Sequence, residues 1–200
     1  MRIAYLVNEF PKISETFILN QITGLIDRGH DVEIFTINFN KDEKFHPDII
    51  KYNLLDHCYE ISPPKSKVGR LVKGLMLLME NVFRYPSILF NSLNFMKYGK
   101  DALSLRLFYS TLMVLSRGNF DTVIAHFGQQ GVMAVKLKEI GAFNCKILTF
   151  FHGTDISAYI RKHGRDSYNS LFKYGDLFLP ISDYWKNELV MLGCEEEKIV

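Results

Sequence analysis

Short apolar runs alternate with amphipathic segments along most of this chain, and that alternation limits the fold more than any other feature. Five runs have the length and composition of buried strands, at 3–7, 31–37, 122–125, 146–151 and 176–179. Segments with helical spacing of their apolar residues lie at 14–28, 130–140, 166–174 and 183–192. Strands that alternate with helices predict an α/β fold, with a mainly parallel sheet, right-handed crossovers and helices on both faces.

Local signals place the helix ends and a second group of helices. We expect Ser14 to cap the first helix and the Arg28-Gly29 pair to end it. Residues 38–64 are polar and irregular, apart from a short strand predicted near 57–61. From 66 to 117 the pattern is helical, and Pro86 and Gly99 divide it into predicted helices at 66–84, 86–97 and 100–116. The block 61–117 is therefore a helical insertion in the sheet domain.

The composition is that of a globular protein with one large core. Of the 200 residues 48% are apolar and 23% are charged, which predicts a single domain over 1–200. A net charge of +2 excludes a polycation that coats nucleic acid. The three cysteines have neither disulfide-framework nor zinc-ligand spacing. No apolar run reaches the roughly 18 residues that span a bilayer. The first residues lead directly into a strand, so we expect a cytoplasmic protein without a signal peptide.

The small net charge hides a local asymmetry. Residues 61–117 contain nine cations and two anions, so this block is +7 and the rest of the chain is −5. The same block is very apolar, and its first helix has a wide apolar face that comprises Leu71, Val72, Leu75, Met76, Leu78, Met79, Val82 and Phe83. The simplest interpretation is that this face packs on the sheet and that the cations form a solvated rim. The alternative is docking to an anionic membrane surface.

Ligands of parallel α/β sheets bind beyond the carboxyl ends of the strands, so the residues after each strand are the candidates for a site. The first such loop, 8–16, contains no glycine, which argues against a dinucleotide site, and the chain has no P-loop. The loop instead offers a helix start with Ser14, Glu15 and Thr16. These residues are either a plain helix cap or a place where free N–H groups hold a phosphate or a sugar hydroxyl.

Two histidines follow apolar strands at equivalent positions. His126 comes after 122–125, and His152 comes after 147–151 and is followed by Gly153, Thr154 and Asp155. A single histidine there would more often be structural, but two at one edge of a sheet favour a site in which Asp155 orients an imidazole or binds hydroxyls. A metal triad of His126, His152 and Asp155 is a weaker alternative, because short ligand spacing is missing. A hydrolytic triad lacks a nucleophile elbow.

Two further segments lie at the same predicted edge. Ser182 or Asp183 caps the helix 184–192, and the position of Ser182 also allows a ligand role. Residues 159–165 are basic and aromatic, and as a loop they could reach a phosphate or an anionic head group.

Four segments resemble those of one enzyme family: FPKISETFIL at 10–19, AHF at 125–127, FHGTDI at 151–156 and LPIS at 179–182. They are similar to the amino-terminal half of retaining glycosyltransferases of family 4, also called group 1, especially those of colanic acid and other exopolysaccharide biosynthesis. The resemblance implies one half of a GT-B fold, with a Rossmann-like acceptor domain here and a donor domain that binds a nucleotide sugar. It also implies chemistry that needs no divalent metal and no cofactor besides the nucleotide sugar as donor substrate.

The resemblance also implies roles for residues. His152 would be the catalytic residue, because the matching histidine reaches the transferred sugar. The first-loop residues would line the acceptor side. With the strand-end residues, this gives the following candidates for substrate binding: Glu9, Phe10, Ser14, Glu15, Thr16, His126, Gly153, Asp155 and Ser182. Two departures affect acceptor recognition, namely Glu9-Phe10-Pro11 in place of a glycine pair and Asn20-Gln21 in place of an Arg-Glu pair.

The expected function is transfer of a hexose from a nucleotide sugar to a lipid-linked saccharide acceptor, by a cytoplasmic protein peripheral at the inner face of the membrane. Residues 198–200 have the pattern of a new strand, which in the family leads toward the donor domain. We therefore expect the donor domain to be absent from this chain, which would fold but not transfer sugar alone. The alternative from another class is a non-catalytic Rossmann-like ligand-binding or interaction module with structural histidines.

Overall fold

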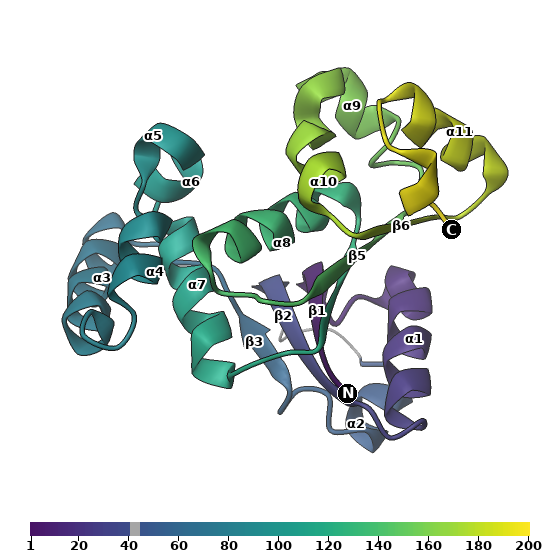
Figure 1. Cartoon of the computed structure of the whole chain (residues 1–200). Coiled ribbons are helices and arrows are strands. Elements are labelled where there is room, and N and C mark those ends of the chain that lie inside the picture. The colour runs from purple at the N-terminus through teal and green to yellow at the C-terminus, as the bar shows by residue number, and fades with distance from the viewer. Residues whose placement is uncertain (41–44) are drawn as a thin grey trace.

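The computed structural model describes residues 1–40 and 45–200, which form a parallel sheet with helices on both faces (Figure 1). The sheet has six strands in the order β3-β2-β1-β4-β5-β6, and each neighbouring pair is parallel. The strands are β1 (Arg2–Phe10), β2 (Asp31–Phe39), β3 (Cys58–Glu60), β4 (Thr122–His126), β5 (Lys146–Phe151) and β6 (Leu177–Pro180). Ile199 forms a further parallel bridge to Phe178, as the strand-like pattern at 198–200 predicts.

Each face of the sheet has its own core. On one face, α1 (Thr16–Ile26) and α2 (Pro47–Lys51) cover side chains such as Tyr5 and Ile124. On the other face, α7 (Arg106–Arg117), α8 (Gly128–Ile140) and α10 (Asn169–Tyr174) cover side chains such as Leu6 and Val123. Residues one apart in a strand thus enter opposite cores, since successive side chains point to opposite faces.

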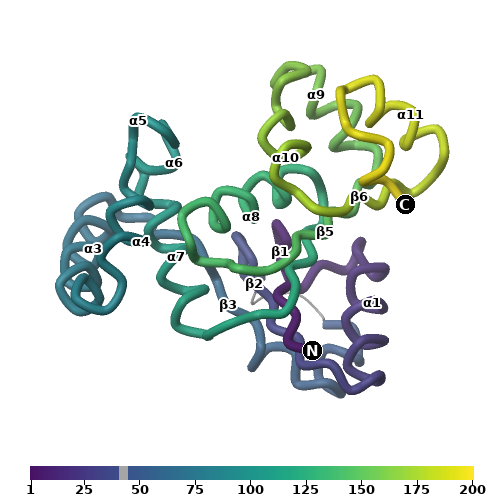
Figure 2. The backbone as a smooth tube through the Cα atoms, in the orientation of Figure 1, coloured from purple at the N-terminus to yellow at the C-terminus, as the bar shows by residue number. Residues whose placement is uncertain are grey.

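The chain winds outward from the middle of the sheet in two directions. From β1 it proceeds to β2 and β3, then returns across the sheet to β4 and continues to β5 and β6. The direction of winding reverses between β1 and β4, and such a switch point opens a crevice at the carboxyl ends of the strands. Figure 2 follows this path, with the insertion after β3 at one side and the last helices at the other.

The insertion has more helices than its pattern predicts. In place of three, it contains α3 (Lys67–Asn81), α4 (Pro86–Ser92), α5 (Phe95–Tyr98), α6 (Lys100–Leu103) and α7. The predicted helix 86–97 is interrupted because Asn94 accepts a hydrogen bond from the N–H of Lys97 and so starts a new turn. The predicted helix 100–116 is interrupted because Leu105 adopts a left-handed backbone, with φ of 59°.

Other differences lie in the remaining connections. The segment expected to be irregular contains α2, which begins at Pro47 with His46 as its cap. The basic segment expected to be a loop forms α9 (Ala158–His163), and the helix predicted at 166–174 divides into a 3₁₀ turn, η2 (Arg165–Tyr168), and α10. The chain enters α1 through another 3₁₀ turn, η1 (Ile13–Glu15), while α11 (Asp183–Met191) and the 3₁₀ turn η3 (Glu196–Lys198) lie at the end of the chain.

The apolar face of α3 does not pack on the sheet, so the simplest interpretation of that face is wrong. Leu71, Val72, Leu75, Met76, Met79 and Phe83 are exposed, and Leu78 and Val82 are half-buried. The helix instead packs through its other side on a small core of its own that includes Leu89, Phe108 and Tyr109. No helix of the described residues is long and apolar enough to cross a bilayer.

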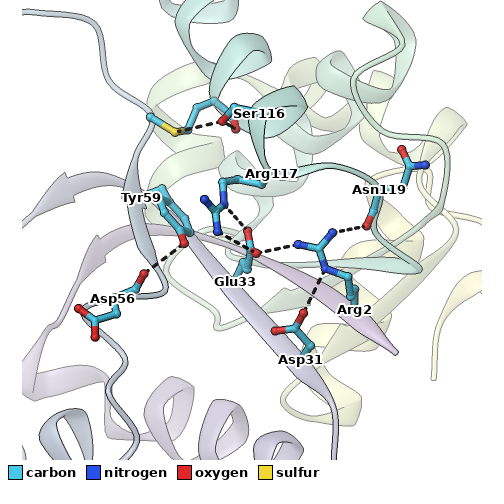
Figure 3. A network of polar contacts seen from close by, with 9 residues as sticks. Arg2, Asp31, Glu33, Asp56, Tyr59, Ser116, Arg117 and Asn119 are labelled. Atoms are coloured by element: carbon cyan, nitrogen blue, oxygen red, sulfur yellow. Dashed lines mark hydrogen bonds and ion pairs between the residues drawn. The ribbon is translucent and has the colours of Figure 1, made fainter.

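An ion-pair network ties the end of the insertion to the sheet, at the edge where the strands begin (Figure 3). The carboxylate of Glu33 on β2 is nearly buried and bonds to Arg2 Nη2 at 2.7 Å and to Arg117 Nε at 3.0 Å. Arg2 also donates to the carbonyl of Asn119, and the guanidinium of Arg117 lies 4.3 Å from the ring centre of Tyr59. The network therefore joins β1, β2, β3 and the end of α7 on the side away from the strands' carboxyl ends.

Candidate functional site

Strand alternation brings the two predicted histidines together. His126 is the last residue of β4 and pairs with Phe150 of β5, so it is part of the strand rather than the first residue past it. His152 lies two residues after Phe150 and therefore on the same face of the sheet. This is the face that α1 covers, and it lies at the switch point between β1 and β4. The location is the crevice where open α/β sheets bind ligands.

A chain of hydrogen bonds joins α1 to both imidazoles. Nδ1 of His126 lies 3.1 Å from Nε2 of His152, and Nε2 of His126 lies 2.8 Å from Oε1 of Gln21. With the amide placed this way, His126 donates from Nε2 to Gln21 and accepts at Nδ1 from the Nε2–H of His152. Gln21 thereby fixes the tautomers of both rings, and His152 keeps an unprotonated Nδ1 for a ligand.

Burial keeps both imidazoles neutral. The pKa of His126 is lowered to about 3 because the ring is buried, and the neighbouring His152 contributes by charge repulsion. The pKa of His152 is lowered to about 4, also because of burial. At neutral pH the pair is therefore a hydrogen-bonding unit without charge, suited to polar, uncharged groups such as hydroxyls.

Aromatic rings surround the pair. The ring centre of Phe17 lies 4.6 Å from that of His152, and the ring of Phe150 stacks on His126 at 5.0 Å. Together with Gln21 and Ile181, these residues line an open cleft of about 490 Å³, which we call the histidine cleft. Apolar walls with a few fixed polar groups are typical of small-molecule sites. The one imidazole nitrogen left outside this chain of hydrogen bonds, Nδ1 of His152, together with the aromatic rings, is chemistry that suits a sugar.

Asp155 braces the cleft and does not orient an imidazole, as the sequence suggests it could. Its carboxylate is buried and accepts from the backbone N–H of Gly128 at 2.9 Å and of His152 at 3.0 Å. Burial raises its pKa, and these backbone hydrogen bonds oppose that rise. The one side chain therefore holds the start of α8 and the exit of β5 together, which fixes His152 relative to His126.

Close packing explains the glycines on either side of this brace. A Cβ on Gly153 would lie 2.8 Å from the ring of Trp185, and the residue has φ of +86°. A Cβ on Gly128 would lie 2.4 Å from the ring of Tyr168. Phe127, just before Gly128, has φ of 71°, which is unusual for a residue with a side chain. Strained backbone of this kind is frequent at functional sites.

The first-loop residues lie apart from the histidine cleft. Glu9, Phe10, Glu15 and Thr16 line a separate apolar cavity of about 120 Å³ on another side of α1. Phe10 is 4% exposed and forms part of the core. The carboxylate of Glu15 pairs with Lys12 at 2.7 Å. The structure thus divides the predicted substrate-binding residues between two places.

One predicted helix cap is wrong, and the other holds in position only. Ser14 is exposed within η1, and α1 begins two residues later at Thr16 with no side-chain cap, because the chain enters through a 3₁₀ turn. Ser182 does occupy the cap position of α11, but its side chain makes no capping hydrogen bond. Ser182 is exposed and does not line the histidine cleft, although its neighbour Ile181 does. The predicted end of the first helix at Arg28-Gly29 is nearly right. The helix α1 ends two residues earlier, at Ile26, with no basic residue in its last turn, and Gly29 has φ of 79° in the turn that follows.

A metal triad has no support from the geometry. No group of three histidine, cysteine, aspartate or glutamate side chains within 1–40 and 45–200 could hold a metal ion. Both carboxylate oxygens of Asp155 are already bonded to backbone N–H groups. The carboxylate thus faces the backbone of the two turns.

The predicted site residues include none of four residues that line the cleft, Phe17, Gln21, Phe150 and Ile181, although Gln21 belongs to the Asn20-Gln21 departure. Gln21 lies 105 residues before His126 and joins it only through the fold. The spacing of Phe17 and Gln21 indicates that they lie on one face of the helix after β1, because they are four residues apart.

Comparison with known proteins identifies the family of the chain. The model of Glycosyltransferase Family 4 matches residues 14–200. WcaL of Escherichia coli (strain K12), assigned as a colanic acid biosynthesis glycosyltransferase, is 38% identical over all of this chain and 49% of its own length. The amylovoran biosynthesis glycosyltransferase AmsK of Erwinia amylovora is 33% identical over the same shares. The chain thus spans about half the length of the curated relatives it matches.

Solved structures show the same fold. All of this chain aligns with 43% of Anabaena Alr3699/HepE, crystallised with UDP-glucose, at a TM-score of 0.59 and 12% identity. It also aligns with 44% of the lipopolysaccharide outer core galactosyltransferase WaaB at a TM-score of 0.56 and 17% identity. The six-stranded sheet corresponds to one half of a GT-B glycosyltransferase. The family match and the identities show that this chain belongs to glycosyltransferase family 4, as part of its amino-terminal half.

Proposed function

We propose that this chain is the acceptor-binding half of a retaining hexosyltransferase. The whole enzyme moves a hexose from a nucleotide sugar to a lipid-linked oligosaccharide in bacterial polysaccharide biosynthesis. The observation that supports this most is the pair of neutral imidazoles in an open aromatic cleft at the switch point of the sheet. The names of the relatives, from colanic acid and amylovoran biosynthesis, support the polysaccharide class.

His152 acts at the junction of donor and acceptor. Its Nε2 is bonded to His126, so Nδ1 accepts a hydrogen bond from a hydroxyl of the transferred sugar. Phe17 packs against the imidazole of His152 from the α1 side and so limits the positions that a sugar ring can take. Such contacts favour transfer by orientation and by stabilising charge in the transition state, with no metal required.

The remaining candidates bind or position the acceptor. His126, Gly153 and Asp155 hold His152 in place, through the imidazole contact, the glycine turn and the backbone brace. The first-loop residues Glu9, Phe10, Glu15 and Thr16, which line the separate cavity, form a second contact region for the acceptor, with the exposed Ser14 beside them. The exposed Ser182 forms a third, next to Ile181. The donor nucleotide belongs to a second domain, in line with relatives that are about twice as long.

The test compares residues 1–200 with the native gene product that contains them. Transfer of labelled hexose from a panel of nucleotide sugars to lipid-linked saccharides is measured for both, and NMR gives the anomeric configuration of the product. We expect transfer with retention by a protein that includes the second domain, and none by residues 1–200. Transfer by residues 1–200 alone would contradict the division of labour. A two-domain protein that binds saccharide but transfers no hexose would favour a non-catalytic binding module.

A further inference from the structure

The insertion exposes an unusual amount of apolar surface. Of the 21 large hydrophobic side chains that are exposed in the described chain, 11 lie within residues 68–103. They are Val68, Leu71, Val72, Leu75, Met76, Met79, Phe83, Phe90, Phe95, Met96 and Leu103. Phe83 is 95% exposed and Met96 84%, although aromatic and thioether side chains are normally buried. Exposed apolar side chains concentrated in one segment are typical of an interaction site.

Helix α3 supplies most of this surface and has two apolar faces. One face, with Gly74, Leu77 and Leu78, packs on α4 and α7, where Gly74 lies against Leu105 and Tyr109. The other face consists of Val68, Leu71, Val72, Leu75, Met76 and Met79, and these positions span about 140° of the helix at 100° per residue. The second face has no cover, and we call it the α3 face.

Cations flank the α3 face, and few of them are neutralised. Within the insertion, Lys97 pairs with Glu139 and Arg117 with Glu33, while the anion Asp101 pairs with Lys136. Seven cations then remain against one anion, Glu80. Among these, Lys65, Lys67, Lys73 and Lys100 form no ion pair with any residue in 1–40 or 45–200. Lys65 and Lys67 lie at the start of α3. At 100° per residue, Lys73 lies about 60° beyond Met76, with Glu80 between them, and it lines a pocket with Lys65 and Tyr109.

We propose that the α3 face docks this protein on a bilayer that contains anionic phospholipids. The helix lies in the interface, with its apolar side chains at the boundary of head groups and acyl chains and its lysines on the lipid phosphates. The charge argues against a second copy as the cover, because two such faces would bring two +7 blocks together. The inference rests on exposure and charge, and it stands whether or not the chain takes part in sugar transfer.

The first test is sedimentation with vesicles. Residues 1–200 are mixed with vesicles of phosphatidylcholine alone or with 30% phosphatidylglycerol. We expect at least tenfold stronger binding to the anionic vesicles, and a loss of that difference between 50 and 500 mM salt. Equal binding to both vesicles, or none to either, would overturn the proposal.

Matched variants locate the surface. Leu71→Ser, Leu75→Ser and Met79→Ser together should weaken vesicle binding at least tenfold, whereas Val190→Ser with Met191→Ser, which are exposed on α11, should not. Lys67→Glu with Lys73→Glu should have the same effect as the serine variant, and Lys146→Glu with Lys173→Glu should have little. Circular dichroism confirms that each variant is folded. If the serine variant on α3 and the serine control on α11 weaken binding equally, or if the two glutamate variants do so, the α3 face is not the docking surface.

A fluorescent residue tests insertion directly. Phe83→Trp places an indole beside the α3 face, and its emission should shift to shorter wavelength with anionic vesicles and be quenched by brominated acyl chains. Trp185 lies elsewhere, against Gly153, and gives the background. An unchanged emission would exclude insertion. Light scattering of the protein without vesicles tests whether a second copy of the chain covers the α3 face. A dimer that is lost in the serine variant, in a protein that does not bind vesicles, would assign the face to a second copy.

Discussion

His126 and His152 are the residues whose chemistry depends most on the fold. Both are neutral because burial lowers their pKa values, to about 3 and about 4. The unfolded chain binds protons at these positions near pH 6.5, whereas the folded chain does not until the pH is much lower. As the pH falls below 6.5, the unfolded chain takes up protons that the folded chain does not, so unfolding becomes more favourable. The contribution of the two histidines to stability is therefore complete above pH 6.5 and is lost below it.

This gives a prediction for stability. Between pH 7.5 and 5 the free energy of unfolding should fall below pH 6.5, with a slope from each histidine of up to about 1.4 kcal/mol per pH unit. Urea denaturation at a series of pH values measures the slope. In His126→Gln the slope should be about half as steep, because one of the two titrating groups is gone. An unchanged slope in that variant would show that His126 is accessible to protons in the folded state.

Gln21 on α1 sets the tautomers of the two histidines, and replacing its amide by a carboxylate should change the protonation of His126. In Gln21→Glu a carboxylate would face Nε2 of His126, 2.8 Å away in the present chain, and would stabilise the imidazolium. The pKa of His126 should therefore rise, and NMR titration of the imidazole nitrogens should show both the rise and a change of tautomer population. Gln21→Met, of similar size, should leave the ring neutral. A titration that is the same in Gln21→Glu and the present chain would contradict the hydrogen-bond chain.

At the scale of elements, the turn from β4 to α8 depends on the absence of a side chain. Gly128→Ala would bring a methyl group to 2.4 Å from the ring of Tyr168, so the ring or the turn must move. Overpacking of this kind costs about 1–3 kcal/mol. Gly69→Ala is the matched control, because its Cβ would meet only Ser66 at 3.5 Å and alanine favours the helix. Thermal unfolding should show a loss for Gly128→Ala and none for Gly69→Ala. Equal changes would mean that the turn tolerates a side chain.

Most of the sheet can be predicted from sequence, because buried parallel strands are short apolar runs between turn signals. The run 146–151 is confirmed residue for residue as β5, and the short strand near 57–61 is confirmed as β3. Helix ends are less predictable, because they depend on contacts of the neighbouring turns. Ser14 satisfies the composition rule for a cap, but Lys12 holds Glu15 and the chain forms a 3₁₀ turn instead. Leu105 has no sequence signal for its left-handed backbone.

The site is partly predictable for the same reason. His126, His152, Gly153 and Asp155 follow strands, and position along a parallel strand translates directly into position at the edge of the sheet. Their partners are not visible in sequence, since Gln21 reaches His126 across 105 positions. Apolar periodicity likewise shows that α3 has a wide apolar face but not what covers it. The prediction that this face packs on the sheet is wrong, because α3 packs through its opposite face on a small core with α4 and α7.

The whole molecule separates three tasks in space. The ion pairs of Arg2, Glu33 and Arg117 hold the sheet at the edge where the strands begin (Figure 3). The histidine cleft opens at the opposite ends of β4 and β5, at the switch point. The insertion lies at one end of the molecule, beside α7, and α9 and α11 lie at the other end (Figures 1 and 2). The membrane docking and the saccharide binding that we propose therefore use different parts of the chain.

The most direct test of this account is the transfer rate of His152→Ala in the native gene product that contains residues 1–200. His57→Ala is the control, because His57 is exposed just before β3, at the edge where the strands begin. If His152 bonds to the transferred sugar, its loss should lower kcat by about 100-fold or more, the usual effect of removing a group that stabilises the transition state. His57→Ala should retain the rate, and both variants should keep the thermal midpoint within a few degrees. An unchanged kcat in a folded His152→Ala protein would contradict the assignment of the histidine cleft as the site of transfer.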